Sequence, residues 1–338
     1  MSIYANVNGM KKISNIFANV GGVKKEITSV WVNKNGVPTK VFEKGGGKLN
    51  RFVCVGTSGV SYYSVDGETW TAMTDWDSSD NATCICYGGG KFIAIARYSS
   101  NAYTPYCYYS TDGETWIKTS RIPSNVTIHS VTYGNGRFVA VGNGGASYYS
   151  TDGETWTKMT GTYYALYGVA YGNGRFVAVG ADGVSYYSTD GETWTAMTKS
   201  TSRTLRFNSV TYGNGRFVVV GNASEVYYST DGETWVTVDK SQMGSSYPTL
   251  NTVAYGNGRF VAVGAGGVSY YSTDGETWTA MTGLPANSIL CVIYAGGKFV
   301  CTCTYLGECN AYSSSDDATW EVMSSLPGAC NYIAYGKA

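Results

Sequence analysis

The chain repeats the phrase Ser-x-Asp-Gly-x-Thr-Trp six times, and a seventh, degraded copy reads Ser-Ser-Asp-Asp-Ala-Thr-Trp. Successive copies lie 38 to 46 residues apart, and the intervals contain only short segments typical of β-strands. A period in this range predicts an array in which each repeat forms one small sheet, or blade. The aspartates of the seven copies are Asp66, Asp112, Asp152, Asp190, Asp231, Asp274 and Asp316.

A single repeat, from Ser130 to Thr160, contains four segments rich in Val, Tyr, Phe, Thr or Trp, each bounded by Gly, Asn or Asp. The Asn135-Gly136 pair suits a tight hairpin, because both residues tolerate positive φ. Trp156 has the largest apolar surface of the unit and is expected to pack against the neighbouring blade. Since no window has a sustained 3.6-residue apolar period, helix is expected to be nearly absent. The expected strands are residues 130–133, 137–141, 146–150 and 154–159.

The two ends of the repeat array complement each other. The first unit begins at residues 50–55 with a second-strand sequence, and its missing first strand is found at residues 331–336. The C-terminal strand should therefore complete blade one and close the ring. The prediction is an all-β protein: a seven-bladed β-propeller of four-stranded blades at residues 46–338, preceded by a small β-hairpin segment at residues 1–45.

The repeated phrase resembles the Asp-box, or BNR repeat, of sialidase-like propellers, shortened by one residue between Asp and Gly. The resemblance covers roughly residues 49–338. In that superfamily the box is a structural hairpin on the face opposite the ligand site. The resemblance therefore implies a fold and assigns the seven aspartates a structural role, and it does not imply a particular chemistry.

The first 45 residues contain two copies of one hairpin phrase, starting at Tyr4 and Phe17, and are rich in lysine. Such N-terminal hairpins resemble those that open many tail and virion proteins of phages infecting Gram-positive bacteria. The resemblance implies a segment that docks to a phage tail or virion component, with the propeller outward as an adhesin head. The alternative is a β appendage that packs on its own propeller.

The composition of the chain limits which classes of partner it can have. The net charge of zero argues against nucleic acid as the main partner, and no apolar run is long enough to enter a membrane. The N-terminus lacks the apolar core of a signal peptide, so we expect synthesis in the bacterial cytoplasm and a final location in the virion. The protein has nine cysteines, which we expect to be reduced structural thiols, and neither Cys-x-Cys pair has zinc-knuckle spacing. No metal and no cofactor are expected.

Catalysis requires residues that depart from the repeat. His129 is the only histidine, which excludes Ser/His, Cys/His and multi-histidine schemes. The loop acids Asp182, Glu225 and Glu308 are candidates for a glycoside hydrolase or lyase, but the sequence does not bring any pair together. Arg121-Ile122-Pro123 is similar to the Arg-Ile-Pro element of sialidases, yet it follows the second box, whereas that family places it before the first. No catalytic residue is therefore assigned.

The most informative contrast is between two sets of loops. The turns joining the first and second strands, and those joining the third and fourth, are nearly identical from blade to blade. The second–third loops and the blade-to-blade loops differ in length and residue type, and they should share the opposite face, as expected of a binding surface. Tyrosine and arginine dominate binding hot spots. The expected ligand-binding residues are Trp76, Tyr98, Tyr103, Arg121, Tyr163, Tyr164, Arg203, Arg206, Tyr247 and Tyr305.

These observations favour a non-catalytic binding module, a phage tail or virion adhesin that recognises a host-surface glycan or protein through the variable face. A sialidase-like glycoside hydrolase or lyase acting on the same face is one alternative. An intracellular protein-interaction scaffold is the other. The sequence leaves open which ligand and host are involved, the oligomeric state, and whether the cysteines pair.

Overall fold

The computed structural model divides the chain into two compact units, Met1–Leu49 and Asn50–Ala338. It describes residues 16–20, 23–27, 29–34, 37–43, 50–98, 105–123, 125–197, 205–244, 246–305, 308–315, 319–326, 328 and 330–337.

The first unit consists of two antiparallel hairpins over its described residues. Strand β1 (Ile16–Val20) pairs with β2 (Val23–Ile27), and β3 (Ser29–Lys34) pairs with β4 (Val37–Glu43). The β1–β2 hairpin corresponds to the second copy of the repeated phrase. The first copy, which starts at Tyr4, lies outside the described residues.

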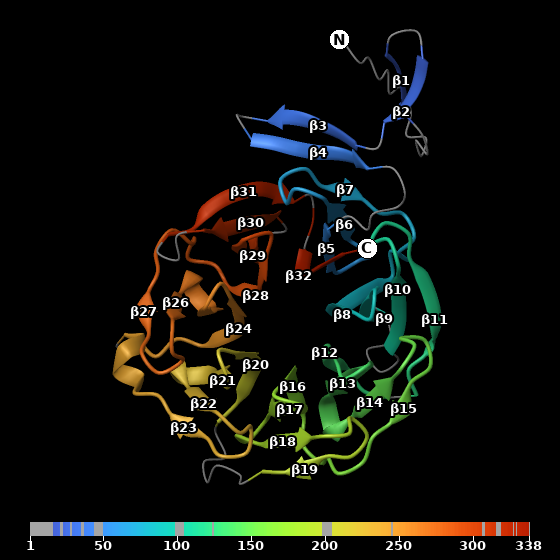
Figure 1. Ribbon diagram of the computed structural model, residues 1–338. Coiled ribbons are helices and arrows are strands. Elements are labelled where there is room, and N and C mark those ends of the chain that lie inside the picture. Colours follow the sequence, from blue (N-terminus) through green and yellow to red (C-terminus); the bar gives the residue numbers. More distant parts are fainter. Residues whose placement is uncertain are drawn as a thin grey trace. The chain divides into compact units, whose positions relative to one another are not determined.

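The second unit is a seven-bladed β-propeller, whose blades stand around a central axis (Figure 1). Each blade is a four-stranded antiparallel sheet, and four short 3-10 turns are the only helical segments among the described residues. Blade one contains β32 (Cys330–Lys337), β5 (Asn50–Gly56), β6 (Ser61–Ser64) and β7 (Thr71–Ala72). Blade two contains β8 (Asp80–Gly88), β9 (Lys91–Tyr98), β10 (Pro105–Ser110) and β11 (Ile117–Arg121). Blade three contains β12 (Ile128–Gly134), β13 (Arg137–Gly142), β14 (Ser147–Ser150) and β15 (Thr157–Lys158).

The remaining blades follow the same order along the chain. Blade four contains β16 (Leu166–Gly172), β17 (Arg175–Gly180), β18 (Ser185–Ser188) and β19 (Thr195–Ala196). Blade five contains β20 (Phe207–Gly213), β21 (Arg216–Gly221), β22 (Val226–Ser229) and β23 (Val236–Thr237). Blade six contains β24 (Leu250–Gly256), β25 (Arg259–Gly264), β26 (Ser269–Ser272) and β27 (Thr279–Ala280). Blade seven contains β28 (Ile289–Ala295), β29 (Lys298–Tyr305), β30 (Glu308–Ser314) and β31 (Glu321–Leu326).

The ring closes as the sequence predicts. The C-terminal strand β32 pairs antiparallel with β5, from Cys330 opposite Gly56 to Lys337 opposite Asn50. Blade one therefore joins the two ends of this unit, and the seven-bladed architecture is confirmed.

The turn between β12 and β13 has the expected chemistry. Asn135 and Gly136 both have positive φ, 47° and 77°, as a tight hairpin of this type requires. The predicted strands of this blade are confirmed, although the fourth, β15, is only two residues long.

The aspartate of each described Ser-x-Asp-Gly copy, called the aspartate turn below, organises the backbone around it. In blade five, Asp231 Oδ1 accepts hydrogen bonds from the backbone N–H groups of Glu233 and Thr234, both at 2.8 Å. The Ser229 hydroxyl donates to the same oxygen and accepts from Gly232 N–H, both also at 2.8 Å. The N–H of Thr234 contributes most to lowering the pKa of Asp231 to about 2. The same pattern recurs at Asp66, Asp112, Asp152, Asp190 and Asp274, whereas Asp316 lies outside the described residues.

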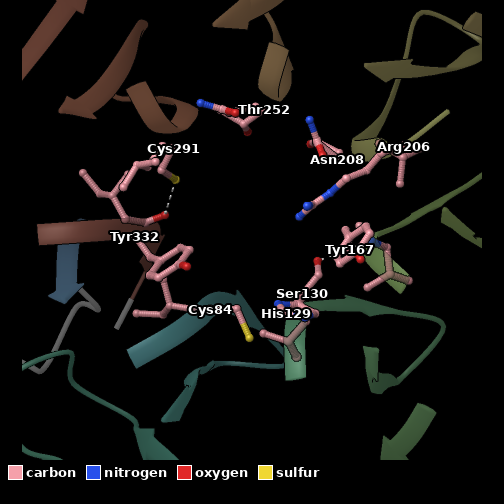
Figure 2. A pocket seen from close by; sticks show the side chains of 18 residues that line it. Cys84, His129, Ser130, Tyr167, Arg206, Asn208, Thr252, Cys291 and Tyr332 are labelled. Atoms are coloured by element: carbon pink, nitrogen blue, oxygen red, sulfur yellow. Dashed lines mark hydrogen bonds between the residues drawn. The ribbon is translucent and has the colours of Figure 1, made fainter. Parts of the chain in front are cut away.

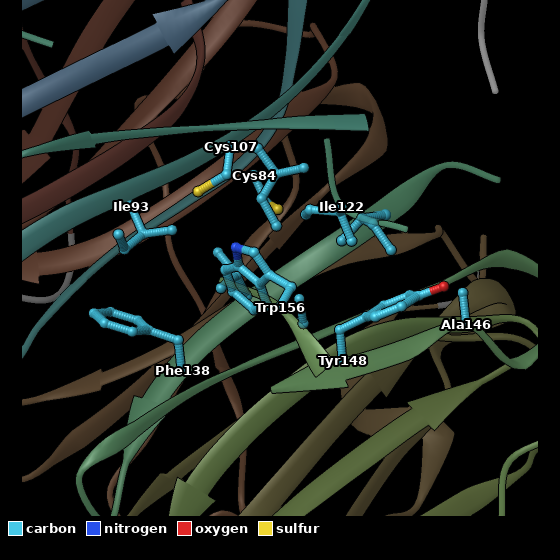
Figure 3. Close-up of a cluster of buried hydrophobic side chains, with 12 residues drawn as sticks. Cys84, Ile93, Cys107, Ile122, Phe138, Ala146, Tyr148 and Trp156 are labelled. Carbon is cyan, nitrogen blue, oxygen red and sulfur yellow. The ribbon is translucent and has the colours of Figure 1, made fainter. Parts of the chain in front are cut away.

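The core lies between adjacent blades. Trp156 is buried in a cluster with Ile93 and Cys107 of blade two and Phe138 of its own blade (Figure 3). The predicted packing of Trp156 against its neighbour is therefore confirmed. Burying an aromatic side chain of this size contributes about 1.5–3 kcal/mol per site.

Ion pairs join neighbouring blades at the outer turns. Arg137, at the start of the second strand of blade three, contacts Glu192 in the aspartate turn of blade four at 2.8 Å. The Arg137 guanidinium also lies 5.3 Å from the ring centroid of Tyr149. Equivalent pairs are Arg51–Glu114, Lys91–Glu154, Arg175–Glu233 and Arg216–Glu276.

Hydrogen bonds show which loops share a face. Lys91, beside the first–second turn of blade two, donates to the carbonyl of Asp152 in the aspartate turn of blade three at 2.9 Å. On the other side, Thr162, in a blade-to-blade loop, donates to the carbonyl of Gly145, in a second–third loop, at 2.7 Å. The uniform turns therefore form one face, the turn face, and the diverse loops form the other, the variable face.

Candidate functional site

Each innermost strand contains one β-bulge near the variable face. In blade three, Ile128 pairs with Gly142 and Ser130 pairs with Val141, so His129 is an extra residue without a partner in the register. A bulge redirects its side chain relative to the regular pleat. The seven bulged residues are Thr83, His129, Tyr167, Asn208, Asn251, Leu290 and Asn331. A uniform backbone feature thus carries Asn in three blades and four different side chains in the other four.

Five of these bulged residues, all except Thr83 and Asn331, line a cavity on the propeller axis, called the axial pocket below (Figure 2). Its volume is about 330 Å³, and residues from all seven innermost segments line it. Polar side chains that line it are His129, Ser130, Tyr167, Arg206, Asn208, Ser209, Asn251, Thr252 and Tyr332. No Asp or Glu is among the lining residues.

Arg206 supplies the positive charge of the axial pocket. Its guanidinium carbon lies 4.0 Å from the ring centroid of Tyr167, which is a cation–π contact. The backbone is fixed by Asn222, whose side-chain oxygen accepts from Arg206 N–H at 2.7 Å and whose N–H donates to the Arg206 carbonyl at 3.0 Å. Gly221 is needed beside it, because a Cβ there would lie 2.2 Å from the Arg206 carbonyl oxygen.

His129 stands next to this pair. Its Nε2 lies 2.8 Å from Asn143 Oδ1, and its ring centroid lies 5.2 Å from that of Tyr167. Burial lowers the pKa of His129, the contact with Asn143 opposes that effect, and the positive charges of Arg206 and Arg97 lower the pKa further. Burial is therefore the main reason why the neutral imidazole is favoured, and the two arginine charges act in the same direction.

Cysteine and tyrosine form the opposite wall of the pocket. Burial raises the pKa of Cys84 to about 12, of Cys291 to about 11 and of Tyr332 to about 12. These groups remain protonated at neutral pH, so they are poor nucleophiles and weak metal ligands. Cys84, Cys86, Cys107 and Cys291 are free thiols, in agreement with the expected structural role.

The predicted ligand-binding residues in blade two are not all at the surface. Trp76 is only 7% exposed and stacks on Tyr108 with ring centroids 4.2 Å apart. The expectation that Trp76 presents its ring to a ligand does not fit this position, because the residue closes the core beneath its loop. Tyr108 in turn donates to Asp80, a fully buried carboxylate that Lys118 contacts at 2.6 Å.

Tyr98 and Arg121 do come together, around Tyr106. The rings of Tyr98 and Tyr106 meet edge to face at 4.9 Å, and Arg121 Nε donates to the Tyr106 hydroxyl at 3.1 Å. Lys118 Nζ lies 4.8 Å and 4.6 Å from the two ring centroids. This group is a second polar and aromatic patch, separate from the residues that line the axial pocket.

The other predicted ligand-binding residues fall into three groups. Tyr163, Tyr164 and Tyr247 are 81%, 39% and 51% exposed, respectively, on blade-to-blade loops of the variable face. Arg206 lines the axial pocket. Tyr103 and Arg203 lie outside the described residues, and of Tyr305 only the backbone, at the end of β29, is described.

The structure describes the side chains of two of the three loop acids that were candidates for catalysis, Asp182 and Glu225. Glu225 is 5% exposed and is ion-paired with Lys240. Asp182 occupies a turn position with a φ of 54°. The side chain of Glu308 is not among those described. Among the described residues, no three His, Cys, Asp or Glu side chains cluster in a way that could hold a metal ion.

Comparison with known proteins identifies the class of the propeller. The chain matches the family described as the DUF6242 beta propeller domain over residues 77–205 and again over residues 200–330. These two matches span most of the chain, and the protein therefore belongs to this family. No curated protein matches it. Within the described part of the chain, no helix has the length and apolarity needed to cross a membrane.

Solved structures show the same fold at low sequence identity. YCF48 bound to D1 peptide is 17% identical, with a TM-score of 0.59, and the match covers 75% of this chain and 85% of that one. YCF48 from Cyanidioschyzon merolae is also 17% identical, with a TM-score of 0.58 and coverage of 75% and 89%. Virginiamycin B lyase from Staphylococcus aureus is 11% identical, with a TM-score of 0.58 and coverage of 75% and 92%. At such identities the likeness concerns the fold alone.

Sequence reasoning found Arg206 but missed the axial pocket. A signal for Arg206 was present in the sequence. In blades three to seven the residue before the first strand is small or hydroxyl-bearing (Thr127, Ala165, Thr249 and Ser288), except in blade five, where it is the charged Arg206. His129 carries no comparable signal, because most other blades also have a polar residue at its position, as at Thr83 and Asn208. Its place in the ring depends on the bulge, which is a property of strand register.

Proposed function

We propose that this propeller is a non-catalytic binding module that recognises a macromolecular ligand through its variable face. The observation that carries the proposal is the axial pocket on the variable face, which five of the seven bulged residues line: His129, Tyr167, Asn208, Asn251 and Leu290. The pocket is surrounded by loops with exposed tyrosines, of which Tyr163 is 81% exposed. A repeat that keeps its backbone constant while its exposed side chains differ is typical of a recognition surface.

In its specific form, the proposal is that the protein is a phage tail or virion adhesin that binds a host-surface glycan, with a surface protein as the second choice. Residues 1–45 dock to the tail or virion component, and the mature location is the virion. The likeness of the aspartate turns to the Asp-box belongs to this proposal as well. Its support is the sequence resemblance, together with pocket walls whose hydroxyl, amide and aromatic groups match those of sugars.

The test is a glycan-array and whole-cell binding screen of the full chain, followed by variants. Replacing Tyr163 and Tyr247 together with Ala should lower the affinity for any retained ligand about tenfold or more, since exposed tyrosines are frequent hot spots. The matched control is Glu154→Gln on the turn face, which should bind as the wild type does. Loss of binding in the control but not in the double variant would refute the assignment of the face.

The docking role of residues 1–45 is tested separately. A chain that lacks these residues should still bind cells but should no longer assemble onto the tail component. A protein partner recovered with a cytoplasmic extract, without any affinity for cells or glycans, would favour the intracellular scaffold instead. Hydrolysis of an oligosaccharide that Glu225→Gln abolishes would favour the glycosidase.

A further inference from the structure

The axial pocket has an unbalanced charge. Arg206 lines it, the positive charges of Arg206 and Arg97 both act on His129, and no carboxylate is among the lining residues. Elsewhere in the propeller, arginines such as Arg137 and Arg175 contact a glutamate of the next blade. By contrast, no ion pair joins Arg206 to a carboxylate within the part of the chain that the structure describes. An anion can therefore supply the partner that the fold does not.

The geometry of Arg206 suits a planar anion. With one face of the guanidinium covered by Tyr167 at 4.0 Å, the N–H groups along its edge remain for hydrogen bonding. Figure 2 shows the guanidinium reaching into the cavity between Tyr167 and Asn208. Such an edge can hold a carboxylate through two parallel hydrogen bonds.

The rest of the pocket offers both acceptors and donors. The amide nitrogen of Asn208 donates to the Leu250 carbonyl, and that of Asn251 donates to the Ile289 carbonyl, both at 2.8 Å, so the two amide oxygens remain as acceptors. Ser130 Oγ accepts from the Val169 N–H at 3.3 Å and keeps its own proton for donation. This alternation complements a ring that carries several hydroxyl groups.

The size of the pocket limits the ligand. Its volume of about 330 Å³ is at the small end of the roughly 300–1,000 Å³ typical of small-molecule sites. Residues from all seven blades surround this open pocket, so it suits a single terminal unit of a chain better than an extended segment. The polar side chains that line the pocket match the hydroxyl groups of a sugar ring better than the apolar side chains of a peptide.

We propose that the axial pocket binds a sugar unit that carries a carboxylate, of the hexuronic acid type, at the end of a glycan. Arg206 holds the carboxylate, and Asn208, Asn251 and Ser130 bind the hydroxyl groups. The inference rests on the proposed function, since it names the chemistry of the unit that the binding module recognises.

The test is calorimetric titration of the full chain with D-glucuronic acid, D-glucose, glucose 6-phosphate and N-acetylglycine. Glucuronic acid should bind at least tenfold more tightly than glucose, because glucose lacks the carboxylate. N-acetylglycine, which imitates a peptide terminus, and glucose 6-phosphate should both bind more weakly than glucuronic acid. Tighter binding of either one would overturn the assignment to an acidic sugar, and so would equal binding of glucose and glucuronic acid.

Variants then locate the site. Arg206→Gln should lower the affinity for glucuronic acid at least tenfold. Arg206→Lys keeps the charge but loses the paired N–H groups, so its affinity should lie between those of Arg206→Gln and the wild type. Arg137→Gln on the turn face is the control and should bind as the wild type does, with circular dichroism confirming that all three variants are folded. Unchanged affinity in folded Arg206→Gln would overturn the inference. If the array shows specific binding of neutral glycans while glucuronic acid fails, this inference falls and the proposed function stands.

Discussion

Replacing Gly213 with alanine should destabilise the propeller through a single contact between blades. Gly213 ends β20, and a Cβ at this position would lie 1.9 Å from Cγ of Tyr255 in blade six. Carbon atoms pack at about 3.5–4.0 Å, so the ring would have to move by roughly 2 Å. Its own packing restrains it, because Tyr255 lies 4.8 Å from Phe260, centroid to centroid.

The magnitude follows from these distances. Overpacking of this kind costs about 1–3 kcal/mol, and we expect the upper end or more because the overlap is with a ring and its Cγ. The backbone itself accepts a side chain, since blade seven has Ala295 at the equivalent position, buried at 2% exposure. Ala295 packs in one buried cluster with the corresponding ring, Tyr335 of blade one, so the cost in blade five depends on how far Tyr255 can move away from the added Cβ.

The assay is urea unfolding of the full chain, with two comparisons. Gly215→Ala, in the next turn, has a φ of 77° and nothing within 4 Å of the added Cβ, so it should cost only the roughly 1–2 kcal/mol of a left-handed alanine. Truncating Tyr255 to Ala should remove most of the additional cost of Gly213→Ala, which a double-mutant cycle measures. Equal costs for Gly213→Ala and Gly215→Ala, or additive effects with Tyr255→Ala, would refute the reasoning.

Three further predictions concern the scaffold. Asp231→Ala should lower the free energy of unfolding by about 1–2 kcal/mol at pH 7. Because the folded state lowers the pKa of Asp231, this contribution is present above pH 4 and is lost as the pH falls toward 2; an unchanged difference from the wild type at pH 2 would contradict it. Arg137→Gln should cost under about 1 kcal/mol through its exposed pair with Glu192, and 1 M salt should abolish the difference; a cost independent of salt would show that packing dominates. Cys84 and Cys107, whose pKa values burial raises to about 12, should resist iodoacetamide at pH 8 until the protein is unfolded, and mass spectrometry of the native protein would reveal any early labelling.

Much of the scaffold was predictable because its determinants are local. The turn residues Asn135 and Gly136 determine a hairpin through their own backbone preferences, and the Asp231 turn is closed by hydrogen bonds within residues 229–234. Ring closure was also predictable, since the displaced first strand could be recognised by comparison with its sister repeats. Repetition turned each local signal into several independent observations.

The candidate site was less predictable because it depends on register and packing. His129 enters the axial ring through a β-bulge, and nothing in its immediate sequence specifies that extra residue. Trp76 lies in a polar loop, yet its ring packs on Tyr108, more than thirty residues away in the chain. The ion pair between Arg137 and Glu192 was equally hidden, because both residues are repeated and only the geometry of adjacent blades brings them together.

Footprinting of the full chain by hydroxyl radicals, with and without a glycan retained on the array, tests the central claim most directly. The account predicts that ligand protects Tyr163, Tyr164 and Tyr247 on the variable face, together with Tyr167 at the axial pocket, and leaves the turn face unchanged. Protection confined to turn-face residues such as Tyr149 or Tyr187 would contradict it.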